Sequence, residues 1–310
     1  MTTVEAADHP HDPAFRCSPW TKAQGVDPIG STARFDALLL VEVPLPWPHD
    51  VSELPLLAGR SAPGVRIMTV VPEDRPRPEG TITVVHRRRT GTNHLAGTDH
   101  RVTEADLPAL LDDLLAAPME DHRSRPSAEG DAPPEVLVCA HGRRDACCGR
   151  WGTLLHLELS ALWSDVRVWR CSHTGGHRFA PTAITLPDGR AWAYAEPDLL
   201  DQVVRRTGDL APLAEHDRGT SALGPWAQVV ERAVLHTLGW RWLDEALTGL
   251  DERVDPDGRS ATVTLRWSGG SATGSVVVER EVPVLSCGEP PAAAAKTAPD
   301  LVLVDFALGS

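Results

Sequence analysis

The chain has 310 residues, of which 42% are hydrophobic. This is enough apolar material for a sizeable core and for about two to three domains of ordinary size. Its 30 lysines and arginines are outnumbered by 43 aspartates and glutamates, so the formal net charge is −13. Because nucleic acids and anionic membranes carry charge of the same sign, this balance excludes both as partners bound mainly through phosphate groups.

The termini, apolar runs and cysteine count indicate a protein of the cytoplasm. Residues 1–13 are acidic and lack the apolar run of a secretory signal. The longest apolar run, residues 38–43, has the length of a strand and not of a membrane span. Six cysteines are too few for a disulfide scaffold in a chain of this size, so we expect reduced thiols in a cytoplasmic protein.

A first α/β unit is predicted over residues 35–118, after a lead-in at residues 1–34 that is rich in proline, aspartate and glycine and is expected to be irregular. The unit should contain strands at 37–43, 65–71, 81–86 and 92–95 and a short helical piece near 51–57. A helix is expected to close it, with Asp106 as the N-cap. One face of this helix is formed by Leu107, Leu110, Leu111, Leu114 and Leu115.

Residues 119–134 are predicted to be a linker, and residues 135–217 a second unit that repeats the same order of elements. Its elements are a buried strand at 135–139, a helix capped by Asp145 and ending near 163, a strand at 166–171, a hairpin of 183–186 and 191–194, and a helix near 197–206. Both units therefore have the order strand, helix, strand, hairpin, helix, which indicates a degenerate duplication.

Residues 218–310 are predicted to form a helix and β-hairpin module. A helix is expected at 225–238, continuing over 240–247, followed by strands at 260–267, 275–282 and 301–306. Helices followed by a hairpin are also typical of winged DNA readers. Because no basic stripe accompanies them, a packing or partner-contact module is favoured. The fold class expected for the whole chain is α/β (α+β).

Chemistry is indicated by two segments of the second unit. Cys139 lies at the carboxyl end of a buried strand, and His173 lies just beyond the end of the next strand, where sites form in open α/β sheets. Cys148 should share the helical face that packs on the sheet, whereas Cys147 lies about 100° around the helix. His177 follows His173 across two glycines, which permit a tight loop that turns both imidazoles to one point.

Two thiolates and two imidazoles suit two kinds of metal centre. A tetrahedral Zn²⁺ site uses this ligand set, and so does a [2Fe–2S] cluster with cysteines on one iron and histidines on the other. Structural zinc sites favour cysteine pairs two to four residues apart. The wider gap between Cys139 and Cys148 leaves room for a binuclear cluster.

At these residues the sequence resembles the sucrase/ferredoxin-like family. The resemblance rests on Cys139, the His141-Gly142 and Arg144-Asp145 pairs, Cys148-Gly149, the His173 to His177 loop with Phe179-Ala180 after it, and the hairpin from Asp188-Gly189 to Trp192. It implies a thioredoxin-like ferredoxin domain whose [2Fe–2S] cluster is held by Cys139, Cys148, His173 and His177. It further implies one-electron transfer with a redox partner protein, so that the protein is expected to carry electrons rather than to turn over a substrate.

The remaining candidates receive simpler interpretations. Cys171 is expected to pack in the core, His141 to hydrogen-bond within its loop, and Cys17 and Cys287 to be ordinary thiols. Two interpretations stay open for Arg143, Arg144 and Arg178, which flank the site: they offset cluster charge or contact a redox partner, or they are solvated arginines. The run from His86 to Arg89 is expected to be a solvated hairpin end. Two alternatives remain open: a zinc-stabilised interaction protein that uses the same four ligands, and a thiol oxidoreductase that uses Cys147 and Cys148.

Overall fold

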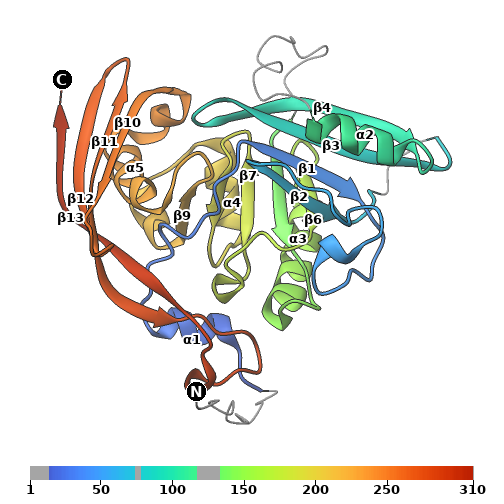
Figure 1. The fold of residues 1–310 in the computed structure, drawn as a ribbon, viewed down its shortest axis with the longest axis horizontal. Coiled ribbons are helices and arrows are strands. Elements are labelled where there is room, and N and C mark those ends of the chain that lie inside the picture. The colour runs from blue at the N-terminus through green and yellow to red at the C-terminus, as the bar shows by residue number, and fades with distance from the viewer. Residues whose placement is uncertain (1–13, 74–77, 117–132, 310) are drawn as a thin grey trace.

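A computed structural model describes residues 14–73, 78–116 and 133–309 of the chain, and these residues form a large and a small β-sheet with helices packed around them (Figure 1). The predicted mixed α/β, or α+β, class is therefore confirmed. Residues 1–13 and most of the predicted linker, residues 119–132, lie outside the described residues. No helix in the described part of the chain is both long enough and apolar enough to span a membrane.

The large sheet has nine strands in the order β4-β3-β1-β2-β6-β5-β7-β8-β9. Their bounds are β1 (Ala37–Glu42), β2 (Val65–Val70), β3 (Thr81–Gly91), β4 (His94–Thr103), β5 (Glu135–Cys139), β6 (Arg167–Cys171), β7 (Ala183–Leu186), β8 (Arg190–Trp192) and β9 (Asp217–Thr220). All residues of β1 and β5 are buried, as expected for continuous apolar strands in the middle of a sheet.

The two halves of the large sheet repeat one arrangement. Strand β1 is parallel to β2 and antiparallel to β3, and β5 is parallel to β6 and antiparallel to β7 in the same way. The halves meet where Val70 of β2 pairs with Cys171 of β6. This repetition agrees with the predicted duplication, although the division of the chain into separate domains is still a prediction.

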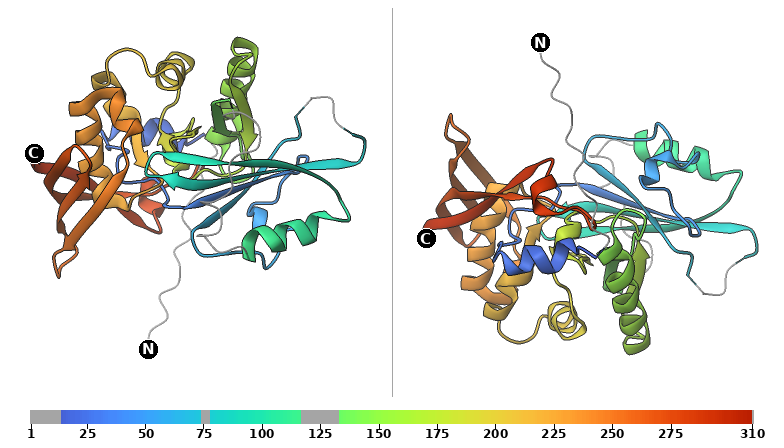
Figure 2. Two further views of the ribbon diagram at one scale, coloured as in Figure 1. Left: turned by 90° about the horizontal axis from the view of Figure 1, so that it is seen from above. Right: turned by 90° about the horizontal axis from the view of Figure 1, so that it is seen from below.

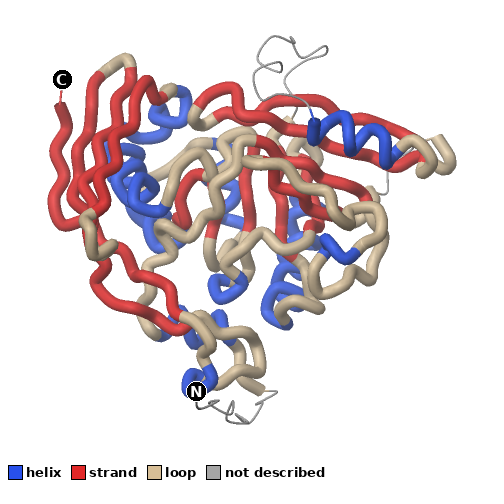
Figure 3. Tube along the Cα trace, in the orientation of Figure 1, coloured by secondary structure: helices blue, strands red, loops and turns tan. Residues whose placement is uncertain are grey.

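Helices cover the large sheet and separate it from the small one (Figure 3). The helices are α1 (Cys17–Ala23), α2 (Leu107–Ala116), α3 (Thr153–Leu162), α4 (Pro197–Arg205) and α5 (Pro225–Leu238). Short 3₁₀ turns lie at Val51–Glu53, His177–Phe179, Ala211–His216, Gly239–Asp244 and Pro291–Ala293, and a π-helical turn at Cys148–Gly152 leads into α3. Helix α5 contacts β9 on one side and the small sheet on the other.

The small sheet is an antiparallel meander of β10 (Leu247–Val254), β11 (Ser260–Trp267), β12 (Gly270–Pro283) and β13 (Thr297–Gly309). Strands β12 and β13 extend beyond their neighbours, and the segment that joins them reaches the side of the molecule on which α1 lies (Figures 1 and 2). The backbone N–H of Gly288 donates a hydrogen bond of 3.1 Å to the carbonyl oxygen of Phe15. The N-terminal segment and the β12–β13 connection therefore meet beside the second half of the large sheet.

Several predicted elements are wrong or incomplete. Residues 17–23 form α1 where an irregular lead-in was expected, and 247–254 form the exposed strand β10 where a helix was expected to continue. Gly239 ends α5 with a φ of +72°, a conformation that favours glycine and stops the helix. The strand expected at 92–95 begins at His94 and runs to Thr103, and β9 was not predicted.

The run from His86 to Arg89 is not a solvated hairpin end, because it lies within the long strand β3. Arg87 is only 3% exposed. Its guanidinium pairs with Glu135 at 2.9 Å and with Asp99 at 2.9 Å. The long hairpin of β3 and β4 thus places these cations against carboxylates of the sheet, a tertiary contact that the charge run alone does not indicate.

A buried ion network connects the large sheet to α5. The guanidinium of Arg190 lies 2.6 Å from Asp217 and 2.5 Å from Glu231, and the three side chains are 1%, 1% and 0% exposed. Glu231 also accepts a hydrogen bond of 2.6 Å from the indole of Trp242. Each of these charges is buried at a cost that only its partners offset.

Candidate metal centre

The ends of two parallel strands bring the first predicted ligands to one edge of the large sheet. Cys139 is the last residue of β5 and pairs in register with Cys171, the last residue of β6. His173 follows two residues later. Because β5 and β6 are parallel neighbours, their carboxyl ends open on the same side.

The helix that carries Cys148 approaches this edge closely. Asp145 accepts hydrogen bonds from the backbone N–H groups of Cys147 at 2.9 Å and Cys148 at 3.4 Å, as predicted for the N-cap. The following residues form the π-helical turn, a feature often found at functional sites. A side chain at Gly152 would meet the carbonyl oxygen of Cys139 at 1.8 Å, so only glycine lets the helix lie this near the strand.

The loop that carries the two histidines is shaped by Gly175 and Gly176, which have φ angles of +87° and +66°. The imidazole rings of His173 and His177 lie with their centroids 5.8 Å apart. A Cβ atom on Gly176 would lie 2.4 Å from the guanidinium of Arg218, which packs against the backbone of this loop. The loop therefore holds both rings on the same side, as the spacing predicted.

Electrostatic interactions join the thiols and imidazoles into one group. The neighbouring thiol of Cys148 and the ring of His173 hold the pKa of Cys139 well below its usual value, although burial opposes this. The same thiol pair, together with burial, raises the pKa of Cys148. Burial lowers the pKa of His177 to about 4, so its imidazole is neutral at pH 7. A thiolate and a neutral imidazole are the forms that bind metals.

One buried nitrogen in this group has no hydrogen-bond partner. It is Nδ1 of His173, whereas Nε2 of His177 lies 3.0 Å from the carbonyl oxygen of Leu285. If that nitrogen of His177 donates to Leu285, its Nδ1 carries a lone pair. A buried nitrogen without a partner is costly, and beside two cysteine thiols it fits a metal ligand. Binding of a metal by these four residues is still a prediction.

Two arginines next to the site were not predicted from the sequence. Arg218 is fully buried and donates to the carbonyl oxygen of Gly175 at 3.0 Å, and Arg66 donates to that of His173 at 2.8 Å. Neither forms an ion pair with a carboxylate within the described ranges. Burial and nearby arginines lower the pKa of Arg218 to about 9, which leaves it charged at pH 7. The site thus lies against uncompensated positive charge.

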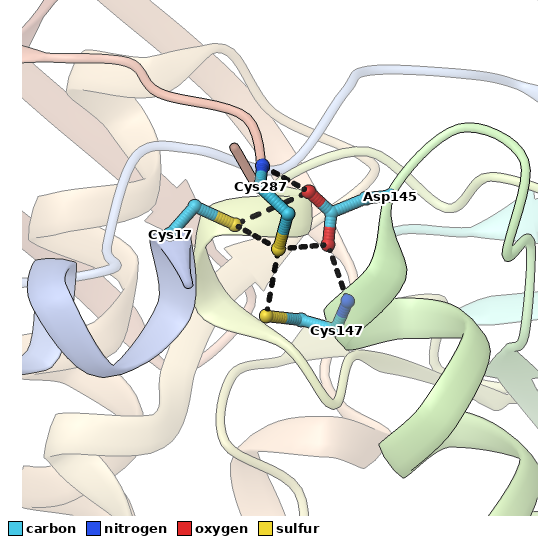
Figure 4. A group of neighbouring side chains, drawn as sticks. All are labelled: Cys17, Asp145, Cys147 and Cys287. Atoms are coloured by element: carbon cyan, nitrogen blue, oxygen red, sulfur yellow. Dashed lines mark hydrogen bonds between the residues drawn. The ribbon is translucent and has the colours of Figure 1, made fainter. Parts of the chain in front are cut away.

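A second group of potential ligands lies beside the first (Figure 4). Its members are Cys17, Asp145, Cys147 and Cys287, whose ligand atoms all lie within 4.8 Å of one another; we call it the Cys3Asp group. Three members are buried and Cys287 is partly buried. Cys17 and Cys287 are free cysteines, and the close partners that the structure gives them were not predicted from the sequence. Their partners lie more than a hundred residues away along the chain, so no local motif marks them.

The other sequence candidates divide into confirmed and corrected ones. Cys171 is fully buried in the core, as predicted. His141 hydrogen-bonds through Nε2 to the carbonyl oxygen of Pro48 at 2.8 Å, and so contacts a segment 93 residues away instead of its own loop. Arg143 is exposed and Arg144 is half-buried. Arg178 is buried against the ring of Phe179, with 4.8 Å from the guanidinium carbon to the ring centroid, and is not solvated.

Comparison with known proteins adds a family and one relative. A family model described as sucrase/ferredoxin-like matches residues 28–219, which is more than half of the chain. A protein of Meyerozyma guilliermondii named altered inheritance of mitochondria protein 32 is 36% identical over 58 residues. This match covers 17% of the chain and only 21% of that protein. No solved structure matches the sequence.

Proposed function

Because the chain belongs to the sucrase/ferredoxin-like family, we propose that it is an electron-transfer protein with a [2Fe–2S] cluster. The proposed ligands are Cys139, Cys148, His173 and His177. When bound, the cluster takes up and releases one electron. The observation that carries the proposal is the buried Nδ1 of His173, which lacks a partner beside a pair of interacting thiols.

The residues of the chain have three tasks at this site. Cys139 and Cys148 supply anionic sulfur, and the loop glycines orient the two rings. The carbonyl oxygen of Leu285 fixes the ring of His177 from outside the loop. Cys139 lies on a strand and Cys148 on a helical turn, so both thiols would be held in fixed positions around the cluster. The βαβ unit of β5, α3 and β6, with its antiparallel hairpin, supports the thioredoxin-like fold that the family resemblance implies.

Isolation of the protein tests the proposal. Anaerobic purification should give a red-brown protein with iron and sulfide in equal amounts, about two of each per chain, whose visible absorbance bleaches with dithionite. A colourless protein whose zinc is lost when Cys139 is replaced would instead support the zinc-stabilised alternative with the same four ligands. A metal-free protein with dithiol activity would support the oxidoreductase alternative.

Arg218 is expected to raise the reduction potential, because its buried charge stabilises the added electron. Replacing Arg218 with methionine should lower the potential by roughly 40–90 mV, which corresponds to about 1–2 kcal/mol for a unit charge at an effective dielectric of 20. The change is measured by spectroelectrochemical titration. Arg218→Lys retains the charge and should lie near the wild-type value. So should Arg150→Met, which removes an exposed charge from the ligand-bearing helix. Equal potentials for Arg218→Met and wild type, with unchanged spectra, would contradict this role.

The partner and compartment are further parts of the proposal. We expect a redox protein as electron donor or acceptor and a cytoplasmic location. The six free thiols support a reducing compartment. Cell fractionation with an antibody against the chain tests the location, and recovery in an oxidising compartment would exclude it.

A further inference from the structure

We propose that the Cys3Asp group is a second, separate metal site that binds one Zn²⁺ ion. The group consists of three thiols and one carboxylate, and it shares no ligand with the proposed [2Fe–2S] site. Its members come from three parts of the chain (Figure 4). Cys17 lies in α1, Asp145 and Cys147 lie at the start of the helix that carries Cys148, and Cys287 lies in the segment between β12 and β13.

The distances within the group suit a tetrahedral ion. With Zn–S bonds of about 2.3 Å, the sulfur atoms of a tetrahedral site lie about 3.8 Å apart, and sulfur and oxygen lie slightly closer. The sulfur atom of Cys287 lies 3.7 Å from that of Cys17 and 3.0 Å from that of Cys147. Oxygen atoms of Asp145 lie 3.2 Å from the sulfur of Cys17 and 3.4 Å from that of Cys287. Small side-chain adjustments therefore suffice to surround an ion.

The chemistry of the donors favours zinc over harder cations. Thiolates select Zn²⁺, Cu(I) and iron, whereas Mg²⁺ and Ca²⁺ require oxygen ligands. Four acidic groups that lie this close together cannot all be ionised without a cation. A dication removes this conflict.

Asp145 is already held in place by the backbone. Its two oxygens accept hydrogen bonds from the N–H groups of Cys147 at 2.9 Å and Cys287 at 3.0 Å. The N–H of Cys148 adds a third bond at 3.4 Å, and because a carboxylate has about four lone-pair positions, one remains for a metal. These bonds orient the carboxylate before a metal arrives and lower the entropic cost of binding.

The position of the group indicates what the ion does. Residues of α1 and of the β12–β13 connection pack over the cysteine and histidine ligands, since Cys17 and Leu285 belong to the same buried cluster as Cys139 and Cys148. Ser18 donates to the carbonyl oxygen of Ala180 at 2.5 Å and so ties α1 to the histidine loop. An ion at the Cys3Asp group would join α1 and the β12–β13 connection to the helix that carries Cys148. Loss of the ion would expose the proposed [2Fe–2S] site to solvent.

Metal analysis of variants tests the proposal. Protein expressed with added zinc and iron is dialysed against EDTA, and its zinc and iron are counted by mass spectrometry. Wild type should retain about one zinc per chain, and Cys287→Ser and Cys17→Ser should each lose it by at least about ten-fold. Ser286→Ala is the matched control beside Cys287 and should keep its zinc. Asp145 is left unchanged, because it also caps the helix.

The results separate this proposal from the proposed function. Zinc lost in Cys287→Ser but retained in Cys139→Ala supports the second site, whether or not iron is present. Zinc retained in both Cys17→Ser and Cys287→Ser, or absent from wild type, overturns it. A disulfide between Cys147 and Cys287, detected by mass spectrometry after alkylation of free thiols, also overturns it. Circular dichroism checks that each variant is folded, and in folded Cys287→Ser the visible absorbance should decay several-fold faster in the presence of a chelator.

Discussion

Alanine in place of Cys139 is expected to abolish the visible absorbance and the bound iron. The substitution removes the thiolate at the end of β5, one of the two in the proposed site. This side chain is fully buried, so water cannot readily supply a replacement ligand. A cluster that lacks one cysteine ligand is not retained. Iron, sulfide and absorbance after anaerobic purification are the measurements, and each should fall to background.

Cys171→Ala is the matched control for this result. Cys171 is equally buried and lies directly opposite Cys139 on the neighbouring strand, but it packs in the core. The control should retain its iron and colour and lose only modest stability. If the Cys139 variant kept its iron while the Cys171 variant lost it, the ligand assignment at this sheet edge would be wrong.

Methionine in place of Arg190 is expected to lower the free energy of unfolding by about 3–5 kcal/mol, because it leaves buried carboxylates without their cation. Asp217 and Glu231 are almost completely buried on either side of this guanidinium. The change is measured by urea unfolding followed by circular dichroism. Arg253→Met removes an exposed arginine from β10 and should stay within about 0.5 kcal/mol of wild type.

Restoring neutrality provides a further check on the Arg190 result. Adding Asp217→Asn and Glu231→Gln to Arg190→Met removes the unpaired charges and should recover part of the lost stability. A loss below about 1 kcal/mol for the single variant would show that the network contributes little.

Most strands of both sheets could be predicted because their signals are local. Strand β5 is a short apolar run, and β11 alternates between buried and exposed residues, so each pattern contains its own evidence of burial. Helix α1 and strand β10 could not be predicted in this way. The first is a seven-residue helix stabilised by its contacts with the histidine loop, and the second is a charged edge strand paired only with β11.

Residues of the candidate site could likewise be predicted only where their sequence signals are local. Cys139, Cys148 and the two histidines were found because strand ends and a glycine loop mark them within one stretch of sequence. The Cys3Asp group and the buried Arg218 were missed, because their neighbours are distant in sequence. Cys17 and Cys287 are 270 residues apart, and Arg218 reaches Ser31 across 187 residues. Sequence spacing carries no information about such contacts.

Because Cys17 contacts Cys287 near the other end of the sequence, the site can be covered only late in synthesis of the chain. All four proposed cluster ligands precede Arg178, so they leave the ribosome well before the segment that contains Leu285 and Cys287. The proposed ligands are therefore accessible in the nascent protein to whatever delivers iron and sulfide. The segment that contains Leu285 and Cys287 can cover them only after translation has passed residue 287. A shortened chain that ends before Leu285 would keep every proposed ligand but lose the covering segment together with strand β13.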